Sequence, residues 1–500
     1  MTDISSPKYA LPQFDNRFAQ RLSDHFFTRL APTPLNAPYI IDVNRPLAYS
    51  LGFSNAQLDS KIFVDVFSGS LVAETSQPLA AVYSGHQFGV WAGQLGDGRA
   101  ILLGELPLFD EASGHTRNVE VQLKGSGLTP YSRMGDGRAV QRSSIREFLC
   151  SEAMAGLHIP TSRALSLIGS NDYVMREQPE KTAVVTRVAE SFIRFGSFEH
   201  WYYNNQPEQL KRLADFVVSH YYTELLDAKN PYSALLEVII KRTASLMAHW
   251  QAVGFMHGVM NTDNMSILGI TLDYGPFGFM DAFDPQHICN HTDVNGRYAY
   301  FMQPRVGLWN CQALAQALYP LIDNLEEVQS HLAGFQAHFE STYQALFRKK
   351  LGLERIDEND SALIAEFLKL MAENHVDFTI CFRRLSEISK LNEKSDAAIR
   401  DLFIDLKAID RWLERYRMRL QSETCDDAGR KLQMNASNPK YILRNYLAQI
   451  AIQKAEQHDF SEIQKLHMIL RTPFDEQEEY NAYAEPPPDW AKTLEVSCSS

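Results

Sequence analysis

The segment from Met256 to Gly275, M-H-G-V-M-N-T-D-N-M-S-I-L-G-I-T-L-D-Y-G, constrains this chain more than any other. It places Asn264 before a short apolar run, M-S-I-L-G-I-T-L, that ends at Asp273. Carboxamide and carboxylate oxygens are the hard ligands that Mg²⁺ prefers. An Asp-Gly neighbourhood is also common in plain turns, but the apolar run, which predicts a short strand, disfavours that alternative. The segment therefore predicts a metal-binding loop.

The same segment resembles the catalytic centre of a protein kinase with one essential letter changed. Kinases use H-R-D-x-x-x-x-N followed by D-F-G, in which the first Asp accepts a proton and the other two residues hold magnesium. Here His257 begins the motif, but Val259 stands at the position of the base and cannot accept a proton. Asp263 is the nearest carboxylate that could, although it could also simply cap its loop. The chain therefore keeps metal and nucleotide residues and changes the step that follows.

A Lys and a Glu that precede this segment are candidates for binding nucleotide phosphates. Lys124 ends N-V-E-V-Q-L-K, whose alternation predicts a strand. Glu147 closes an S-x-x-E capping box that would begin a helix at Ser144. Kinases pair a strand Lys with a helix Glu. The alternatives are an exposed Lys, a Glu that only caps its helix, and Glu152 as the partner; the kinase-like order of the features favours function.

Two copies of G-D-G-R, residues 96–99 and 135–138, flank the predicted strand that ends at Lys124. Asp-Gly is a strong hairpin signal, so simple turns are one interpretation. The other is that the glycines let backbone N–H groups approach phosphates while each arginine offers a fork of donors. Arg187 and Arg194, in the apolar stretch T-R-V-A-E-S-F-I-R-F-G, are further candidates for phosphate contacts, although isolated arginines are usually solvated.

The composition excludes some classes of partner. The chain has 500 residues, 45% hydrophobic and 22% charged, as a soluble globular protein has. Its net charge of -13 disfavours non-specific binding to nucleic acid or to an anionic membrane. We find no bilayer-spanning apolar run, and the N-terminus does not resemble an export signal. The six cysteines include no C-x-x-C pair, which argues against a zinc site or a disulfide framework and predicts a cytoplasmic protein.

The order of the predicted elements indicates an α+β fold. N-V-E-V-Q-L-K, A-L-S-L-I-G and A-V-V-T-R-V predict strands, and helical periodicity takes over after about residue 198. We expect an N-terminal extension (residues 1–60), a strand-rich N-lobe (61–200), a helical C-lobe with the catalytic loop (201–470) and a C-terminal tail (471–500). With nucleotide motifs at the junction, this pattern fits a two-lobed, protein-kinase-like architecture.

Five segments together closely resemble the selenoprotein O family, whose bacterial members are called YdiU. They are V-Q-L-K-G-S-G, Y-S-R-M-G-D-G-R-A, S-S-I-R-E-F, H-G-V-M-N-T-D-N-M-S-I-L-G and D-Y-G-P-F-G-F-M-D. The resemblance runs over nearly the whole chain. It implies a kinase-like fold, long taken for a pseudokinase, that binds its nucleotide in the reverse direction. It also implies transfer of AMP from ATP, and in bacteria of UMP from UTP, to protein hydroxyls.

Carried over by motif, the resemblance implies a role for each candidate residue. Lys124 would hold phosphates and pair with Glu147, and Asp263 would be the general base. Asn264 and Asp273 would bind the metal. Animal members carry selenocysteine three residues from the C-terminus, where this chain has Cys498. The nucleotide site would be lined by Gly96, Gly98, Arg99, Lys124, Asp136, Gly137, Arg187, Arg194 and Asp273.

The preferred interpretation is a cytoplasmic protein nucleotidyltransferase that uses ATP, or UTP, with Mg²⁺ or Mn²⁺. Its partners would be proteins that carry Ser, Thr or Tyr hydroxyls, including the enzyme itself, and neither nucleic acid nor membrane. Two alternatives stay open: a kinase that uses Asp263 as an offset base, and a catalytically dead pseudokinase scaffold. A disulfide between Cys289, just beyond D-Y-G, and Cys498 is a further hypothesis, with two unrelated thiols as its alternative.

Overall fold

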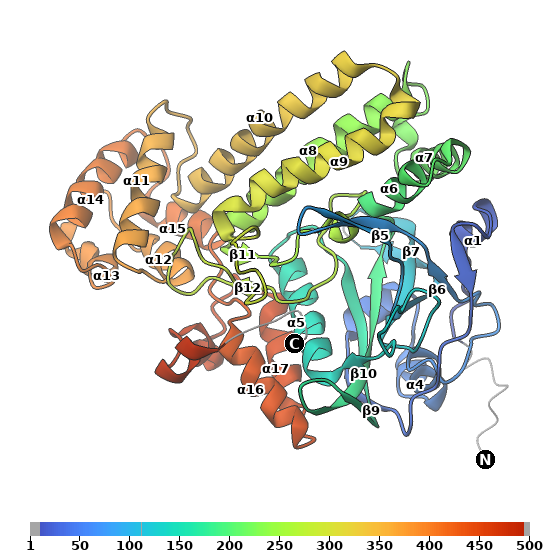
Figure 1. Ribbon diagram of the computed structural model, residues 1–500. Helices are drawn as coiled ribbons and strands as arrows, with labels where there is room; N and C mark the ends of the chain where they lie inside the picture. Colours follow the sequence, from blue (N-terminus) through green and yellow to red (C-terminus); the bar gives the residue numbers. More distant parts are fainter. Residues whose placement is uncertain (1–10, 112, 495–500) are drawn as a thin grey trace.

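The computed structural model of the protein describes residues 11–111 and 113–494. Its strand-rich part is an antiparallel eight-stranded sheet with the order β1-β3-β6-β7-β10-β9-β2, and β8 pairs with β10 (Figure 1). Two of these strands, β1 and β2, come from the part of the chain before residue 60. The strands are β1 (Phe27–Arg29), β2 (Tyr39–Val43), β3 (Leu79–Ala81), β6 (Ala100–Asp110), β7 (His115–Lys124), β8 (Ala139–Val140), β9 (Arg163–Met175) and β10 (Pro179–Ala189).

Both faces of the sheet are covered by hydrophobic clusters. Successive side chains of a strand point to opposite faces, so neighbouring residues of one strand pack into different clusters. Val184 of β10 belongs to a core cluster with Phe63 of α4 (Lys61–Phe67), whereas the next residue, Val185, belongs to a second cluster with Phe148 of α5 (Gln141–Gly156). The sequences that predicted strands ending at Lys124 and around β9 and β10 do form them. The small helices before β3 are α1 (Arg17–Arg21), α2 (Arg45–Ser50), α3 (Asn55–Leu58) and α4.

The helix that carries Glu147 begins earlier than its capping-box pattern predicts. Helix α5 starts at Gln141, and Val140 occupies the N-cap position without a side-chain hydrogen bond. Ser144 and Glu147 therefore lie inside the helix, so the prediction that they cap it is wrong. Val140 of β8 and Ile145 of the helix are both buried. Their packing outweighs the local capping preference, so the helix begins directly after β8.

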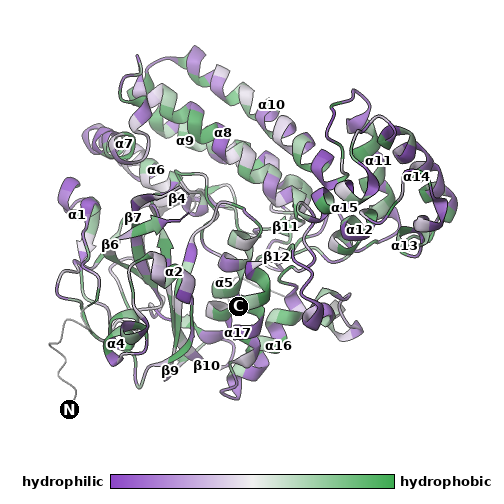
Figure 2. Cartoon of the chain, turned by 180° about the vertical axis from the view of Figure 1, so that it is seen from behind, coloured by the Kyte–Doolittle hydropathy of each residue, from purple (hydrophilic) through white to green (hydrophobic). Residues whose placement is uncertain are grey.

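The second half of the chain is helical, as expected. Helices α8 and α9 lie side by side with α10, and α16 and α17 return along the outer side of α5 (Figure 1). Figure 2 shows long hydrophobic stretches where α8 and α9 meet, and a hydrophilic outer side on α14. The helices are α6 (Phe195–Tyr203), α7 (Pro207–Tyr221), α8 (Pro231–Ala252), α9 (Gln303–Ile322), α10 (Leu325–Lys350), α11 (Asp360–Glu373), α12 (Phe378–Leu385), α13 (Ala397–Arg400), α14 (Leu406–Leu420), α15 (Asp427–Asn435), α16 (Asn445–Glu456) and α17 (Ser461–Arg471).

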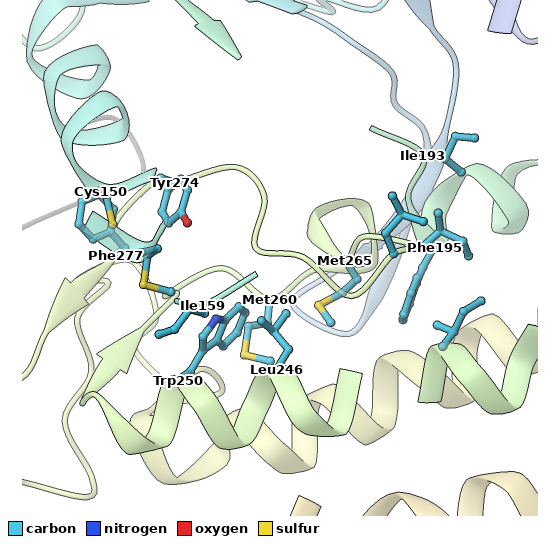
Figure 3. Packing of buried hydrophobic residues seen from close by; sticks show 14 of the residues in the cluster. Cys150, Ile159, Ile193, Phe195, Leu246, Trp250, Met260, Met265, Tyr274 and Phe277 are labelled. Atoms are coloured by element: carbon cyan, nitrogen blue, oxygen red, sulfur yellow. The ribbon is translucent and has the colours of Figure 1, made fainter. Parts of the chain in front are cut away.

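The motif-bearing segment is a loop held on a hydrophobic floor. It follows α8 and contains the short pair β11 (Phe255–Met256) and β12 (Gly278–Phe279) and the 3₁₀ turn η3 (Thr262–Asn264). Figure 3 shows Met260 and Met265 of this loop beside Leu246 and Trp250 of α8. The buried methionines anchor the loop on α8.

The apolar run from residue 265 to 272 is not the strand that its composition predicts. It forms isolated bridges instead, with Met265 opposite Thr271, Ser266 opposite Arg194, and Thr271 opposite Thr161. Gly269 adopts φ = 69°, and this turn brings the two ends of the run together. Asn264 and Asp273 therefore approach each other across a tight loop.

Across residues 11–111 and 113–494, we find no helix with both the length and the apolar character needed to cross a membrane.

Candidate functional site

A cavity of about 520 Å³ lies between the start of β6, the end of β7, the C-terminal end of β10 and the loop after α8. It collects residues that are far apart in the sequence, because the sheet and the loop meet there. Glu147 does not line the cavity, but it binds Lys124, which does. The predicted residues that line the cavity are Gly96, Gly98, Arg99, Lys124, Asp136, Gly137, Arg187, Arg194, Asp263, Asn264 and Asp273.

A continuous chain of ion pairs connects the buried charges of this cavity. Lys124 and Arg187 each bind one carboxylate oxygen of Glu147. Arg187 also donates to Oδ1 of Asp273 at 2.5 Å, and Arg194 binds the other oxygen of Asp273. Burial lowers the pKa of Lys124 to about 8, against the opposing charge of Glu147. The other candidate partner, Glu152, is occupied by Arg163 of β9.

Asp273 is an ionised carboxylate between two arginines. Burial raises its pKa, but the charges of Arg187 and Arg194 outweigh burial and hold the pKa well below its usual range. Its backbone has φ = 57°, a left-handed conformation that is uncommon outside glycine. Strained residues of this kind cluster at functional sites. A permanently charged carboxylate in a fixed position suits metal binding.

Asp263 lines the same cavity in a different electrostatic setting. Its Oδ2 accepts a hydrogen bond from Nε2 of Gln87 at 3.1 Å, and its buried Oδ1 has no hydrogen-bond partner among the described residues. Arg194 donates to the backbone carbonyl oxygen of Asp263 at 2.6 Å rather than to its carboxylate. Burial raises the pKa of Asp263 to about 6, against the hydrogen bond from Gln87 and the charge of Arg194. A carboxylate with this pKa suits proton transfer near neutral pH.

The donor set near Asp273 fits a hard divalent cation. The amide nitrogen of Asn264 donates to the carbonyl oxygen of Val259 at 3.0 Å, which leaves its amide oxygen as the ligand atom. Within the described residues, no three His, Cys, Asp or Glu side chains gather into a metal cluster. Asn264 and Asp273 would therefore share the ion with oxygens of the nucleotide and of water, as is usual for Mg²⁺.

Some residues of the cavity were missed by sequence reasoning. Arg176, which follows β9, pairs with Asp136 at 2.6 Å, and Asp97 is buried and accepts hydrogen bonds from the Ala81 backbone N–H and from Gln122. Gln87 contacts Asp263. No motif marks Arg176 or Gln87; Asp97 could have been suspected from its place inside the first G-D-G-R.

A larger cavity, about 820 Å³, lies on the other side of β10 against α8. None of the predicted residues lines it, and its charged residues are largely engaged: Arg117 pairs with Glu190, and Arg163 pairs with Glu152. Size alone would favour it, but the smaller cavity has the candidate metal donors Asn264 and Asp273, together with Arg99, whose guanidinium has no partner among the described residues. We therefore place the functional site in the smaller cavity.

The redox hypothesis concerns Cys289 and Cys498. Cys289 is buried, and its thiol lies 3.7 Å from the carbonyl oxygen of Met256, on the loop that carries the motif. It does not line the cavity. Cys498 lies outside the described residues, so the pairing stays a prediction.

The cavity has the groups that one class of enzyme needs. They are clustered arginines and a lysine, an ionised carboxylate beside a carboxamide, and a second carboxylate with a raised pKa. The cations suit the phosphates of a nucleotide, the oxygens suit a divalent metal, and the second carboxylate suits proton transfer. This combination defines a nucleotide-dependent transferase.

Comparison with known proteins identifies the family. Residues 11–471 match the family model described as protein adenylyltransferase SelO. The protein nucleotidyltransferase YdiU of Herminiimonas arsenicoxydans is 56% identical over 485 residues, which cover 97% of this chain and 96% of that protein. The protein of the same name from Burkholderia ambifaria (strain MC40-6) is 55% identical over 496 residues, covering 96% and 94%. The chain belongs to the SelO family of protein adenylyltransferases, which confirms the predicted family and enzyme class.

Proposed function

We propose that this protein transfers AMP from ATP to Ser, Thr or Tyr hydroxyls of other proteins and of itself, with UTP as a second donor. The names of the two relatives, protein nucleotidyltransferase, support nucleotidyl transfer. We also propose a kinase-like fold in which residues 61–200 form the N-lobe and 201–470 the C-lobe, flanked by an extension (1–60) and a tail (471–500). The sheet, the helical part and the motif order between them support the two lobes; β1 and β2, from residues 1–60, are strands of the same sheet, so the extension packs as part of the N-lobe.

The observation that carries the proposal is the cation cluster of the cavity. Beyond Lys124, the cluster contains Arg187 and Arg194, both buried, and Arg99, whose guanidinium has no hydrogen bond or ion pair to another described residue. Transfer from the α-phosphorus releases pyrophosphate, whose charge must be neutralised in place. A γ-phosphoryl transfer site needs fewer cations at that position, so the cluster favours nucleotidyl transfer.

The reaction then follows from the residues of the cavity. The acceptor hydroxyl gives its proton to the carboxylate of Asp263 while its oxygen attacks the α-phosphorus of ATP. The new oxygen–phosphorus bond replaces the bond to the β-phosphate bridge, and pyrophosphate leaves toward Lys124, Arg187 and Arg194. Asn264 and Asp273 would hold Mg²⁺ or Mn²⁺, which supplies charge neutralisation to the triphosphate. Val259, at the place of a kinase base, takes no part in proton transfer.

One labelling experiment tests this function. Purified protein is incubated with either α-³²P-ATP or γ-³²P-ATP, with Mg²⁺ or Mn²⁺, and with a mixture of candidate proteins. We expect label on protein from the α position only, and a mass increase equal to AMP on a hydroxyl residue.

The variants Asp273→Ala and Asp263→Ala complete this test. Asp273→Ala should abolish metal-dependent ATP binding in calorimetry, whereas Asp263→Ala should keep binding and lose about 10²–10⁴-fold in turnover. Label from the γ position alone would establish a kinase, and no label from either would favour the scaffold. Repeating the reaction with α-labelled UTP decides the second donor.

A further inference from the structure

The hairpin formed by β4 (Ser84–Gln87) and β5 (Val90–Gln94) lies directly against the loop that follows α8, at its 3₁₀ turn η3. The backbone N–H of His86 donates to Oγ1 of Thr262 at 2.7 Å, and the side chain of Gln87 donates to Oδ2 of Asp263 at 3.1 Å. The backbone N–H of Phe88 donates to Oδ1 of Asn261 at 3.1 Å. Three consecutive hairpin residues thus bind three consecutive loop residues.

We propose that Gln87 is a positioning residue that holds the carboxylate of Asp263 in the orientation for accepting the proton of the protein hydroxyl. This inference rests on the proposed function, in which Asp263 is the base. A residue of β4, in the N-terminal half of the chain, would thus position a residue of the loop after α8, in the C-terminal half.

The hairpin is built to approach the loop closely. A Cβ atom at Gly85 would lie 3.0 Å from both Cβ and Oδ1 of Asp263, so a larger residue there would push the carboxylate away. The turn residues Phe88 and Gly89 have φ of 51° and 82°, the pair of positive values that a tight two-residue hairpin turn requires. This turn fixes the direction in which Gln87 points.

The base of the hairpin is also anchored on α6. Oγ of Ser84 lies 2.8 Å from Nδ1 of His200, and Nδ1 of His86 lies 2.5 Å from Oε1 of Glu199. Gly196 lets the chain approach there, since a Cβ at this position would meet the carbonyl oxygen of Ser84 at 2.1 Å. Contacts with α6 therefore hold the hairpin in place against the loop.

A neutral amide suits this task better than a cation. An arginine in the place of Gln87 would form an ion pair with the carboxylate, as Arg187 and Arg194 do at Asp273. Gln87 occupies Oδ2 without adding charge, and Arg194 is engaged by the carbonyl oxygen of Asp263 and by Asp273. Oδ1 is buried beside Gly85 and has no hydrogen-bond partner among the described residues. Gln87 and the close approach of the hairpin thus hold the carboxylate in one orientation.

The test compares Gln87→Met, which keeps the length of the side chain and loses the donor, with Gln87→Ala, which loses both. The matched control is Gln94→Ala, since Gln94 is an exposed glutamine of the same hairpin that does not line the cavity. AMP transfer is followed with α-labelled ATP, and kcat and the KM for ATP are measured separately. Melting temperature and ATP affinity are recorded for each variant.

We expect Gln87→Met and Gln87→Ala to lower kcat by about 10- to 100-fold, the usual effect of losing a hydrogen bond to a charged group. The KM for ATP, the ATP affinity and the melting temperature should stay within about twofold or a few degrees of wild type, because Gln87 acts on Asp263 and not on the nucleotide. Gln94→Ala should match wild type. A purely structural role would lower kcat only together with the melting temperature or the ATP affinity.

Asp263→Ala, measured in parallel, separates this inference from the proposed function. If Asp263→Ala is nearly inactive and Gln87→Met keeps wild-type kcat, Asp263 stays the base and the positioning role of Gln87 is wrong. A normal Gln87→Met with a slow Gln87→Ala would assign the effect to packing and also overturn the proposal. Full turnover by Asp263→Ala would overturn both the base and its positioning residue.

Discussion

The two G-D-G-R segments have the same four letters and different tasks. Residues 96–99 connect β5 to β6, and residues 135–138 lead into β8; both contribute to one wall of the cavity. Arg99 faces the cavity without a partner among the described residues. Arg138 donates to the carbonyl oxygens of Thr33 and Pro34, at 3.0 and 2.9 Å. One arginine is available to a ligand, and the other ties the loop to the N-terminal segment.

The aspartates of the two segments differ in the same way. Asp97 is buried and forms no ion pair with any residue that the structure describes; burial raises its pKa to about 6. Asp136 is exposed, and the hydrogen bond from Arg176 lowers its pKa. The backbones differ as well, since φ is positive at Gly96 in the first segment and at Gly137 in the second. The same four letters therefore fix neither the backbone conformation nor the role of the charged residues; the surroundings decide both.

The glycines give the largest expected contrast between the two segments. A Cβ at Gly137 would lie 2.2 Å from the backbone carbonyl of Gly127, which cannot move away, and its φ is 71°. Gly137→Ala should therefore cost roughly 3 kcal/mol or more in unfolding free energy. A Cβ at Gly96, where φ is 137°, would lie 2.5 Å from Cγ and 2.9 Å from Cβ of Tyr131, so this site is strained as well. The clash there is with a side chain rather than with backbone, so Gly96→Ala should cost less stability than Gly137→Ala and should weaken ATP binding, because Gly96 lines the cavity; chemical denaturation and calorimetry of both variants measure the difference.

The arginines should separate binding from stability. Arg99→Ala removes a donor fork that is available to phosphates, so ATP affinity should fall by about 10- to 100-fold at unchanged melting temperature. Arg138→Ala removes two hydrogen bonds to backbone carbonyls, so it should lower the melting temperature and change ATP affinity less. Calorimetric titration and thermal unfolding of both proteins test this. Equal losses of affinity would make the two segments functionally equivalent and break the comparison.

The aspartates should differ in how stability depends on pH. The pKa of Asp97 rises from 3.8 in the unfolded chain to about 6 in the folded protein. The folded protein binds this proton more tightly, so Asp97 costs stability as pH rises through this window. Asp97→Asn should remove that cost, about 3 kcal/mol at neutral pH, and should bring no gain below the window. Denaturation curves at a series of pH values check it.

Asp136→Asn is the matched control for Asp97→Asn. Its lowered pKa means that its contribution is present above the usual range and is lost as pH falls. This variant should therefore show no gain in stability at neutral pH. A gain equal to that of Asp97→Asn would show that the environment of the two aspartates does not matter.

The smallest effect is expected at the ion pair between Arg176 and Asp136. The carboxylate side chain is 38% exposed, so water and salt screen the pair. Arg176→Ala should change unfolding free energy by only about 0–1 kcal/mol. Because Arg176 also lines the cavity, ATP affinity measured at low and high salt shows whether it adds to binding. A large loss of stability would mean that the second segment depends on this pair.

Much of the fold and the site was predictable where local pattern and chemistry coincide. Alternating apolar residues before Lys124 predicted β7, and the order of motifs predicted which residues share one cavity. Prediction failed where packing outweighed local preference. Ser144 and Glu147 lie inside α5 rather than at its start, and the apolar run after Asn264 folds into bridges rather than a strand.

The sequence by itself determined the family, the presence of cationic residues and of candidate metal ligands, and the replacement of the kinase carboxylate by Val259. These depend on which residue types occur and in what order. Only the tertiary structure decided their environments. It placed two arginines on Asp273 and the amide of Gln87 on Asp263, and it left Arg99 open while it tied down Arg138. The physical reason is that charge, burial and hydrogen bonding act through space, between β4, β10 and a loop that are distant along the chain.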